Sequence, residues 1–238
     1  MTQIACATAA NVGADPLEIL SFTNGLGTDQ FNLVIEHAAG PAPGRLKYVI
    51  FPTGSDPTIT EFHTASGTIV GNKNAAGTAA VGAAFFGTPT VLESFSSAGS
   101  TPILFDTSGN LLGTPDARPS PSIVCADGGN NTFLGTDIAG DADTDPNFFG
   151  TSASAPHAAG IAALVLDMNG GLTPAALYQA LELSAVDMDD PATEDDDDLG
   201  FDTGTGHGFC DAEAAVNLAK CGNGLPDSGE GCDDGNND

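Results

Sequence analysis

The hydrophobic positions follow a two-residue period between residues 17 and 62. In QFNLVIEH, Phe31, Leu33 and Ile35 fall on one face, and RLKYVIF, LEILSFTNG and TITEFHT are runs of the same kind. The turn sequences NGLG, GPAPG and PTGSDP separate these runs. Short alternating runs between turns are typical of an antiparallel sheet or a small sandwich. The pattern predicts a β-rich region over residues 15–66.

The period changes near residue 67, where the chain becomes rich in Gly and Ala. Two runs, residues 79–86 and PSIVCA at 121–126, are almost entirely apolar and predict strands that are buried on both faces. Residues 152–168 are apolar nearly all round, which predicts a central helix rather than a surface helix.

Two more helices are expected after residue 171. LTPAALYQALELSAV has Thr173 as its N-cap and Pro174 at the first helical position, and DAEAAVNLAK forms the third helix. Buried strands that alternate with helices predict an α/β fold.

The net charge of the protein limits the classes of molecule that it is expected to bind. The 238 residues are 41% hydrophobic and include 5 Lys and Arg against 32 Asp and Glu, for a net charge of −27. A polyanion does not seek phosphates, so nucleic acid and anionic membranes are excluded as partners, whereas cations are favoured. No apolar run reaches the length of a membrane span, and the first residues show no signal peptide.

The five cysteines indicate the redox state of the compartment in which the protein folds. Cys125 lies in the apolar run SIVCADG and is expected to be a small buried residue. Cys221 and Cys232 flank a loop of Gly, Pro and acidic residues, which predicts a disulfide-stapled module and an oxidising compartment. We interpret residues 220–238 as the truncated start of a Cys-rich repeat.

Acidic residues gather in GTDIAGDADTDPNFFG. The alternate spacing of the carboxylates lets successive oxygens converge on a hard cation, which predicts a calcium site. The alternative is a solvated acidic loop, the interpretation that we also give to residues 194–198. The predicted ligands are Asp137, Asp141, Asp143 and Asp145.

Ser152 stands where GTS leads into the apolar helix, and it is either a helix cap or a nucleophile. GTSASAPHAAG resembles the nucleophile motif of the subtilisin-like serine peptidases, with Gly150, Ser152 and His157 in matching places. The resemblance implies that Ser152 is the nucleophile, that Gly150 and Thr151 bind substrate, and that His157 is structural. A serine at a helix start also lies where backbone N–H groups favour an oxyanion.

The resemblance extends over residues 67–219. AAVGAAFF, ESFSSAGS and SIVCADG resemble successive segments of the family, as do the two C-terminal helices and the turn GTGHG. It implies a subtilisin-like parallel sheet flanked by helices, present here as a partial domain, with residues 15–66 as an insertion. It also implies a polypeptide substrate and a chemistry that requires no cofactor.

The partners of Ser152 are missing from the sequence. A serine nucleophile needs an imidazole and an orienting carboxylate, which precede it in this family. His37 and His63 lie in extended runs and match no family motif. ATAANVGADP resembles the oxyanion segment, which would end at residue 14 with Asn11 as the oxyanion donor; the alternative is a polar turn residue.

Two functions remain open at this stage. The first is a secreted serine endopeptidase, of which this chain is a fragment that lacks the catalytic Asp and His and needs the missing N-terminal part of its domain. The second is a non-catalytic secreted module that binds calcium or serves a structural role.

Overall fold

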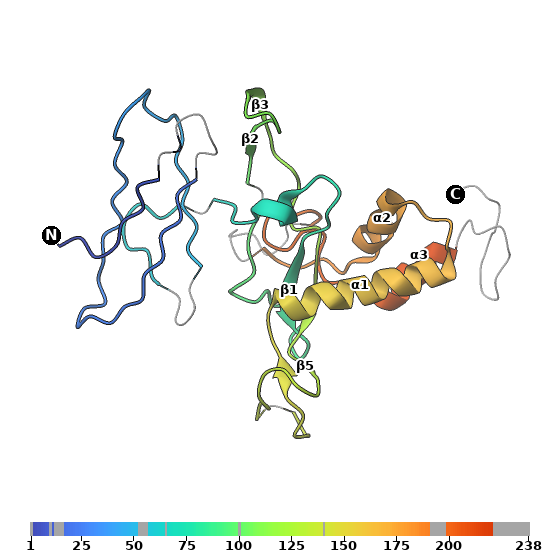
Figure 1. Ribbon diagram of the computed structural model, residues 1–238. Coiled ribbons are helices and arrows are strands. Elements are labelled where there is room, and N and C mark those ends of the chain that lie inside the picture. The colour runs from blue at the N-terminus through green and yellow to red at the C-terminus, as the bar shows by residue number, and fades with distance from the viewer. Residues whose placement is uncertain are drawn as a thin grey trace. The chain divides into compact units, whose positions relative to one another are not determined.

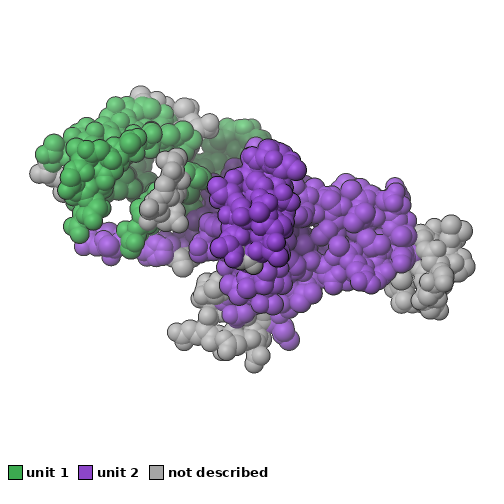
Figure 2. All heavy atoms as spheres, turned by 90° about the horizontal axis from the view of Figure 1, so that it is seen from below, with its two compact units in different colours: residues 1–59, 104–115 green, residues 60–103, 116–238 purple. Residues whose placement is uncertain are grey.

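A computed structural model describes residues 2–9, 11, 17–51, 57–64, 66–99, 101–139, 141–190 and 199–220. Two compact units divide the chain: residues 1–59 with 104–115, and residues 60–103 with 116–238 (Figure 2). The elements, shown in Figure 1, are η1 (Gly71–Asn74), β1 (Val81–Phe85), β2 (Ile103–Phe105), β3 (Leu111–Asp116), β4 (Ile123–Asp127), β5 (Gly129–Asn130), β6 (Asn147–Phe148), α1 (Thr151–Met168), α2 (Pro174–Ser184) and α3 (Ala212–Lys220).

The second unit is built around a parallel pair of strands. β1 pairs with β4 in parallel, with Val81 opposite Ile123 and Phe85 opposite Asp127. Along the other edge of β4, the Val124 N–H donates to the Gly208 carbonyl at 2.8 Å and the Cys210 N–H donates to the Val124 carbonyl at 2.8 Å. These contacts confirm the predicted α/β class with a parallel sheet, and they place the GTGHG turn against its central strand.

The two faces of β4 contribute to two apolar clusters, as the period of a strand requires. Ile123 and Cys125 pack on one side with residues of all three helices, whereas Val124 packs on the other side with Ala84 and Met188. Both buried strands were predicted from their continuous apolar runs, and both are confirmed.

The three predicted helices are also confirmed. The Thr173 side chain accepts a hydrogen bond from the Ala176 N–H at 3.2 Å and caps α2, with Pro174 at its first position. The prediction that α1 is central rather than on the surface is confirmed only in part. α1 packs against β1, β4, α2 and α3, yet Leu164 is 55% exposed and Leu166 is 39% exposed.

The expected β-rich region is not confirmed by the described part of residues 15–66, where no strand is formed. β2 and β3, which the sequence analysis did not anticipate, pair in a two-stranded sheet instead. The alternating apolar residues are largely exposed there; Leu33, Ile35 and Leu46 are each more than half exposed. The burial that would fix a strand register is therefore missing.

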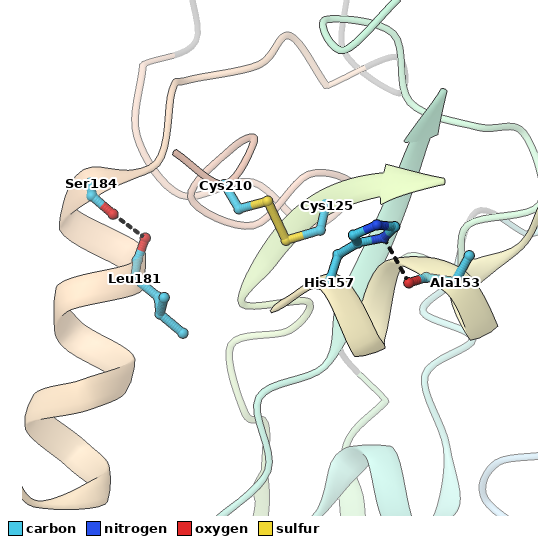
Figure 3. Close-up of a disulfide and its surroundings, with 6 residues drawn as sticks. All are labelled: Cys125, Ala153, His157, Leu181, Ser184 and Cys210. Carbon is cyan, nitrogen blue, oxygen red and sulfur yellow. Dashed lines mark hydrogen bonds between the residues drawn. A yellow bond between two sulfur atoms is a disulfide. The ribbon is translucent and has the colours of Figure 1, made fainter. Parts of the chain in front are cut away.

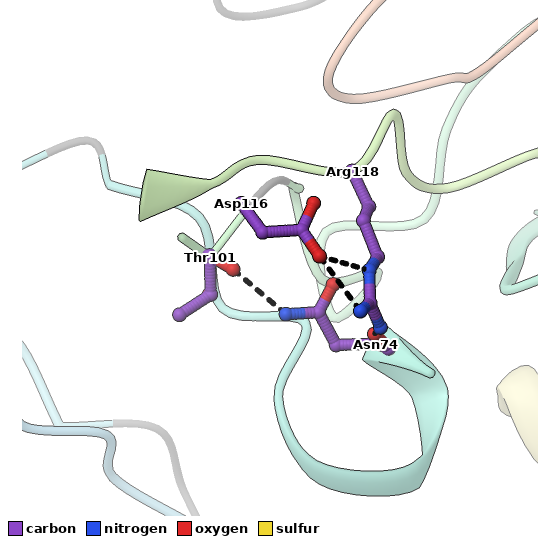
Figure 4. A network of polar contacts seen from close by, with 4 residues as sticks. All are labelled: Asn74, Thr101, Asp116 and Arg118. Carbon is purple, nitrogen blue, oxygen red and sulfur yellow. Dashed lines mark hydrogen bonds and ion pairs between the residues drawn. The ribbon is translucent and has the colours of Figure 1, made fainter. Parts of the chain in front are cut away.

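Arg118, which follows β3, fastens the end of that strand to η1 (Figure 4). Its guanidinium donates to Asp116 Oδ2 at 2.7 and 2.9 Å and to the Asn74 carbonyl at 2.6 Å. The Asn74 side-chain amide donates in turn to the Thr101 carbonyl at 2.7 Å. This network joins residues of the second unit on both sides of the β2–β3 segment, where the chain leaves that unit after residue 103 and returns to it at residue 116.

Some predictions lie outside the described residues: the Cys221–Cys232 pair, the acidic run at 194–198 and residues 12–14 of the oxyanion segment. In the described part of the chain, none of the helices combines the length and apolar character that crossing a bilayer demands.

Candidate active site around Ser152

Ser152 is the second residue of α1, and it lies on a turn that only Gly150 makes possible. Gly150 is the N-cap, with φ of 109°, a conformation that side chains rarely adopt. Its carbonyl accepts the Ala153 N–H at 2.8 Å, which starts the helix. The small residues that follow let Ala153, Ser154 and Ala158 pack closely into the core.

The Ser152 side chain is not a helix cap. No side-chain hydrogen bond caps α1, and within the described residues the Ser152 hydroxyl has no hydrogen-bond partner. The residue is exposed. A free hydroxyl at a helix N-terminus, where backbone N–H groups point outward, is suited to attack a bound carbonyl group.

His157 does not approach Ser152 as a base. Its Nδ1 lies 3.0 Å from the Ala153 carbonyl oxygen, to which a protonated Nδ1 donates (Figure 3). This contact ties the imidazole to the preceding turn of its own helix. The described residues therefore include no histidine that is hydrogen-bonded to Ser152.

The sequence analysis missed a buried carboxylate beneath this turn. Asp127, the last residue of β4, is fully buried, and its Oδ2 accepts the Gly150 N–H at 2.8 Å. An acidic residue at the end of an apolar run, directly before two glycines, was the available signal. The charge of Asp127 also acts on Glu93: burial is the larger cause and Asp127 the smaller one of a raised pKa at the Glu93 carboxyl.

An open pocket of about 410 Å³ adjoins the turn. Its wall includes Phe149, the residue before Gly150, whose ring stacks on that of Phe85 at a centroid distance of 5.7 Å. Glu93 is the only charged residue among the described residues of the lining, and the others are apolar apart from Thr88: Phe85, Val91, Leu92, Ile138 and Phe149. Through Phe149, the pocket brings apolar surface next to the Gly150 turn.

The acidic loop is closed by β5 and β6 and is organised around Asn147. The buried Asn147 side-chain amide donates to the Gly128 carbonyl at 2.9 Å and to Asp141 Oδ2 at 2.9 Å, and its Oδ1 accepts the Ile138 N–H at 3.1 Å. Asn130 likewise donates to Asp143 Oδ2 at 2.6 Å. Amide groups thus hold two of the four carboxylates expected to bind calcium, Asp141 and Asp143.

The other predicted ligands, Asp137 and Asp145, are exposed. Among the described residues, no three acidic, His or Cys side chains come together as a metal site. Calcium binding stays a prediction from the sequence.

Asn11 lies in the first compact unit, and Ser152 in the second. The Asn11 side-chain amide donates to the Leu17 carbonyl at 2.6 Å and to Glu18 Oε1 at 2.9 Å. Its assignment as the oxyanion donor stays a prediction, as do the substrate-binding roles of Gly150 and Thr151.

A disulfide joins Cys125 to Cys210 (Figure 3). Cys125 is fully buried, as predicted, but the sequence analysis did not pair it. The two residues are 85 positions apart, with Cα atoms at 5.3 Å. Cys6 is a free, exposed thiol. The bond fastens the GTGHG turn to β4 covalently.

Several solved structures of proteases are similar to this chain. A protease of Pseudoalteromonas arctica is 20% identical, with a TM-score of 0.38 and coverage of 62% of this chain and 38% of that chain. The patellamide maturation protease PatA is 23% identical, with a TM-score of 0.37 and coverage of 62% and 45%. Fervidolysin of Fervidobacterium pennivorans, a keratinolytic enzyme related to subtilisin, is 22% identical, with a TM-score of 0.37 and coverage of 61% and 20%.

The chain spans less than half the length of each of these structures. No curated protein matches it. The model of the subtilase family, Peptidase S8, matches residues 62–208, which is more than half of the chain and includes β1, β4 and the Ser152 turn. The chain therefore belongs to the subtilase family of serine peptidases.

Proposed function

We propose that the chain carries the nucleophile of a secreted serine endopeptidase and that Ser152 attacks the peptide carbonyl of a polypeptide substrate. The observation that carries the proposal is the exposed hydroxyl of Ser152 on the Gly150 turn at the start of α1, which no described residue engages in a hydrogen bond. Attack by Ser152 forms an acyl-enzyme through a tetrahedral oxyanion, which the helix N-terminus and the Asn11 side-chain amide stabilise. Water then hydrolyses the acyl-enzyme.

We further propose that the base and the orienting carboxylate belong to a part of the domain that this chain does not contain. His37 and His63 match no family motif, and His157 contacts its own helix. The exposed apolar side chains Leu164 and Leu166 support a partner segment that covers the uncovered part of α1 in the complete domain. The buried disulfide supports an oxidising, extracellular location.

The second candidate is a non-catalytic secreted module. What favours it is the same solitary Ser152 hydroxyl, because serine without a base is a weak nucleophile. The two candidates differ in what a completed domain does, since only a peptidase gains hydrolysis when the missing catalytic groups are supplied.

Labelling with a fluorophosphonate tests the proposal. We expect the 238-residue chain to label slowly, and a chain completed with an N-terminal segment carrying the family's Asp and His to label rapidly and cleave peptides. In the completed chain, Ser152→Ala should lower kcat by at least about 10⁴-fold. Ser154→Ala is the matched control, because Ser154 lies two residues further along, is buried and should be dispensable.

Full hydrolysis by the completed Ser152→Ala variant would refute the role of Ser152. Rapid stoichiometric labelling of the 238-residue chain would instead show that the chain supplies its own base, and His63 would be the first residue to replace.

A further inference from the structure

Asp127 is a buried carboxylate whose burial the hydrophobic core does not explain. It is 0% exposed, its Oδ2 accepts the Gly150 N–H, and its Oδ1 is buried with no hydrogen-bond partner in the described residues. Removing a carboxylate from water costs several kcal/mol unless its interactions compensate. We therefore expect an interaction of the Asp127 carboxylate that accounts for its burial.

The backbone of Asp127 is fixed on two sides. The Phe86 N–H donates to the Asp127 carbonyl at 3.1 Å, which extends the β1–β4 pairing. The N–H of the next residue, Gly128, donates to the Phe148 carbonyl at 2.9 Å, in the segment that leads into the nucleophile turn. The carboxylate therefore projects from a rigid part of the sheet.

The Asp127 carboxylate holds the backbone N–H of Gly150, the first residue of the turn that carries Ser152. The N–H of Gly150 is bound by Asp127, and its carbonyl is bound by the Ala153 N–H at 2.8 Å. α1 has no side-chain cap of its own, so a carboxylate from β4 takes that place. A negative charge at this end also interacts favourably with the helix dipole.

We propose that Asp127 is a positioning residue: it anchors the Gly150 peptide and so sets the direction of the Ser152 hydroxyl two residues later. The role of Asp127 at Ser152 rests on the proposed function, whereas its hold on Gly150 does not. Because it acts through Gly150, its loss should slow the reaction of Ser152 while leaving the binding of a ligand unchanged.

Amide hydrogen exchange of the ¹⁵N-labelled 238-residue chain tests the anchor. Hydrogen bonds to charged groups are the stronger ones, so Asp127→Ala should accelerate exchange at Gly150 by about ten- to a hundredfold. Asp127→Asn keeps an acceptor oxygen and should restore most of the protection. In Asp127→Asn, the amide proton resonance of Gly150 should move upfield because its acceptor has lost the negative charge of the carboxylate.

Asp190 supplies a matched control. It is 3% exposed, and its Oδ2 accepts the Gly204 N–H at 3.1 Å. Asp190→Ala should therefore accelerate exchange at Gly204 and leave Gly150 protected. Unchanged exchange at Gly150 in folded Asp127→Ala, or equal acceleration there in Asp190→Ala, would overturn the anchor. If Asp127→Ala does not fold, an unmoved Gly150 resonance in Asp127→Asn would do so.

Labelling kinetics in the completed domain test the consequence for Ser152. Asp127→Ala should lower the limiting rate of fluorophosphonate labelling by about tenfold or more at an unchanged half-saturating probe concentration, and Asp127→Asn should recover much of it. Absence of labelling in the unsubstituted completed domain refutes the proposed function, while the exchange result still decides the anchor. Unchanged labelling of Asp127→Ala with accelerated Gly150 exchange would refute the positioning role alone.

Discussion

Gly128 combines a restricted backbone conformation with a crowded surrounding. Its φ is +70°, and a Cβ atom there would lie 2.6 Å from a ring carbon of Phe85 and 2.9 Å from one of Phe149. Alanine would have to displace the stacked rings beside the pocket as well as adopt the left-handed conformation. The absence of a side chain at Gly128 therefore lets the end of β4, which carries Asp127, pack against the rings that line the pocket next to the Ser152 turn.

We expect Gly128→Ala to lower the free energy of unfolding by about 2–4 kcal/mol, from backbone strain plus overpacking. Gly71→Ala is the matched control, because Gly71 has φ of +68° in the same unit with nothing within 4 Å of its Cβ position. That variant should lose only about 1–2 kcal/mol. Equal losses in chemical denaturation would show that the rings yield without cost.

At the scale of an element, the acidic loop is held both by its flanking strands and by side-chain amides. β5 and β6 close it, and the Asn147 amide connects Asp141 to the backbone of Gly128. A cation must compete with amide donors for Asp141 and Asp143. The sequence pattern supplied the ligand types, but it held no information on these competing amides.

The calcium prediction has a direct thermodynamic test. An ion bound by carboxylates of this loop should release heat and raise Tm at millimolar calcium. The double variant Asp141→Asn with Asp143→Asn should lose both effects, whereas Asp29→Asn with Glu36→Gln, two exposed residues outside the loop, should keep them. Absence of heat and of a Tm rise, or their persistence in the loop variant, would refute the site.

The elements that sequence analysis predicted correctly depend on local patterns. The apolar runs of β1 and β4 and the Thr173–Pro174 start of α2 are visible in a few consecutive residues. The features that it missed join distant residues: Asp127 to Gly150, and Cys125 to Cys210. The prediction of a central rather than a surface helix holds for α1 only in part, because composition tells how apolar a helix is, not how much of its surface is covered in this chain.

At the scale of the molecule, the disulfide is the longest covalent constraint in the described residues. Replacing Cys125 and Cys210 together by Ala should lower the free energy of unfolding by about 2–5 kcal/mol, because the unfolded chain regains the freedom of an 85-residue loop. Denaturation under oxidising conditions measures this loss. Cys6→Ala, which removes an exposed free thiol, should leave stability unchanged.

Reductant provides an independent check of the same constraint. The unsubstituted chain should fall to the stability of the double variant when it is reduced, and the double variant should not respond. A double variant as stable as the oxidised chain would mean that the core around β4 holds the GTGHG segment without the bond.

The same bond makes the molecule a covalent ring from residue 125 to residue 210, with α1, α2 and Ser152 inside it. A single peptide cut anywhere between these cysteines opens the ring without dividing the molecule. A nicked chain would therefore migrate as one piece until its disulfide is reduced, and α3 would stay attached to the strand beneath it. After one such cut, Ser152 and the helices and strand around it stay in the same molecule.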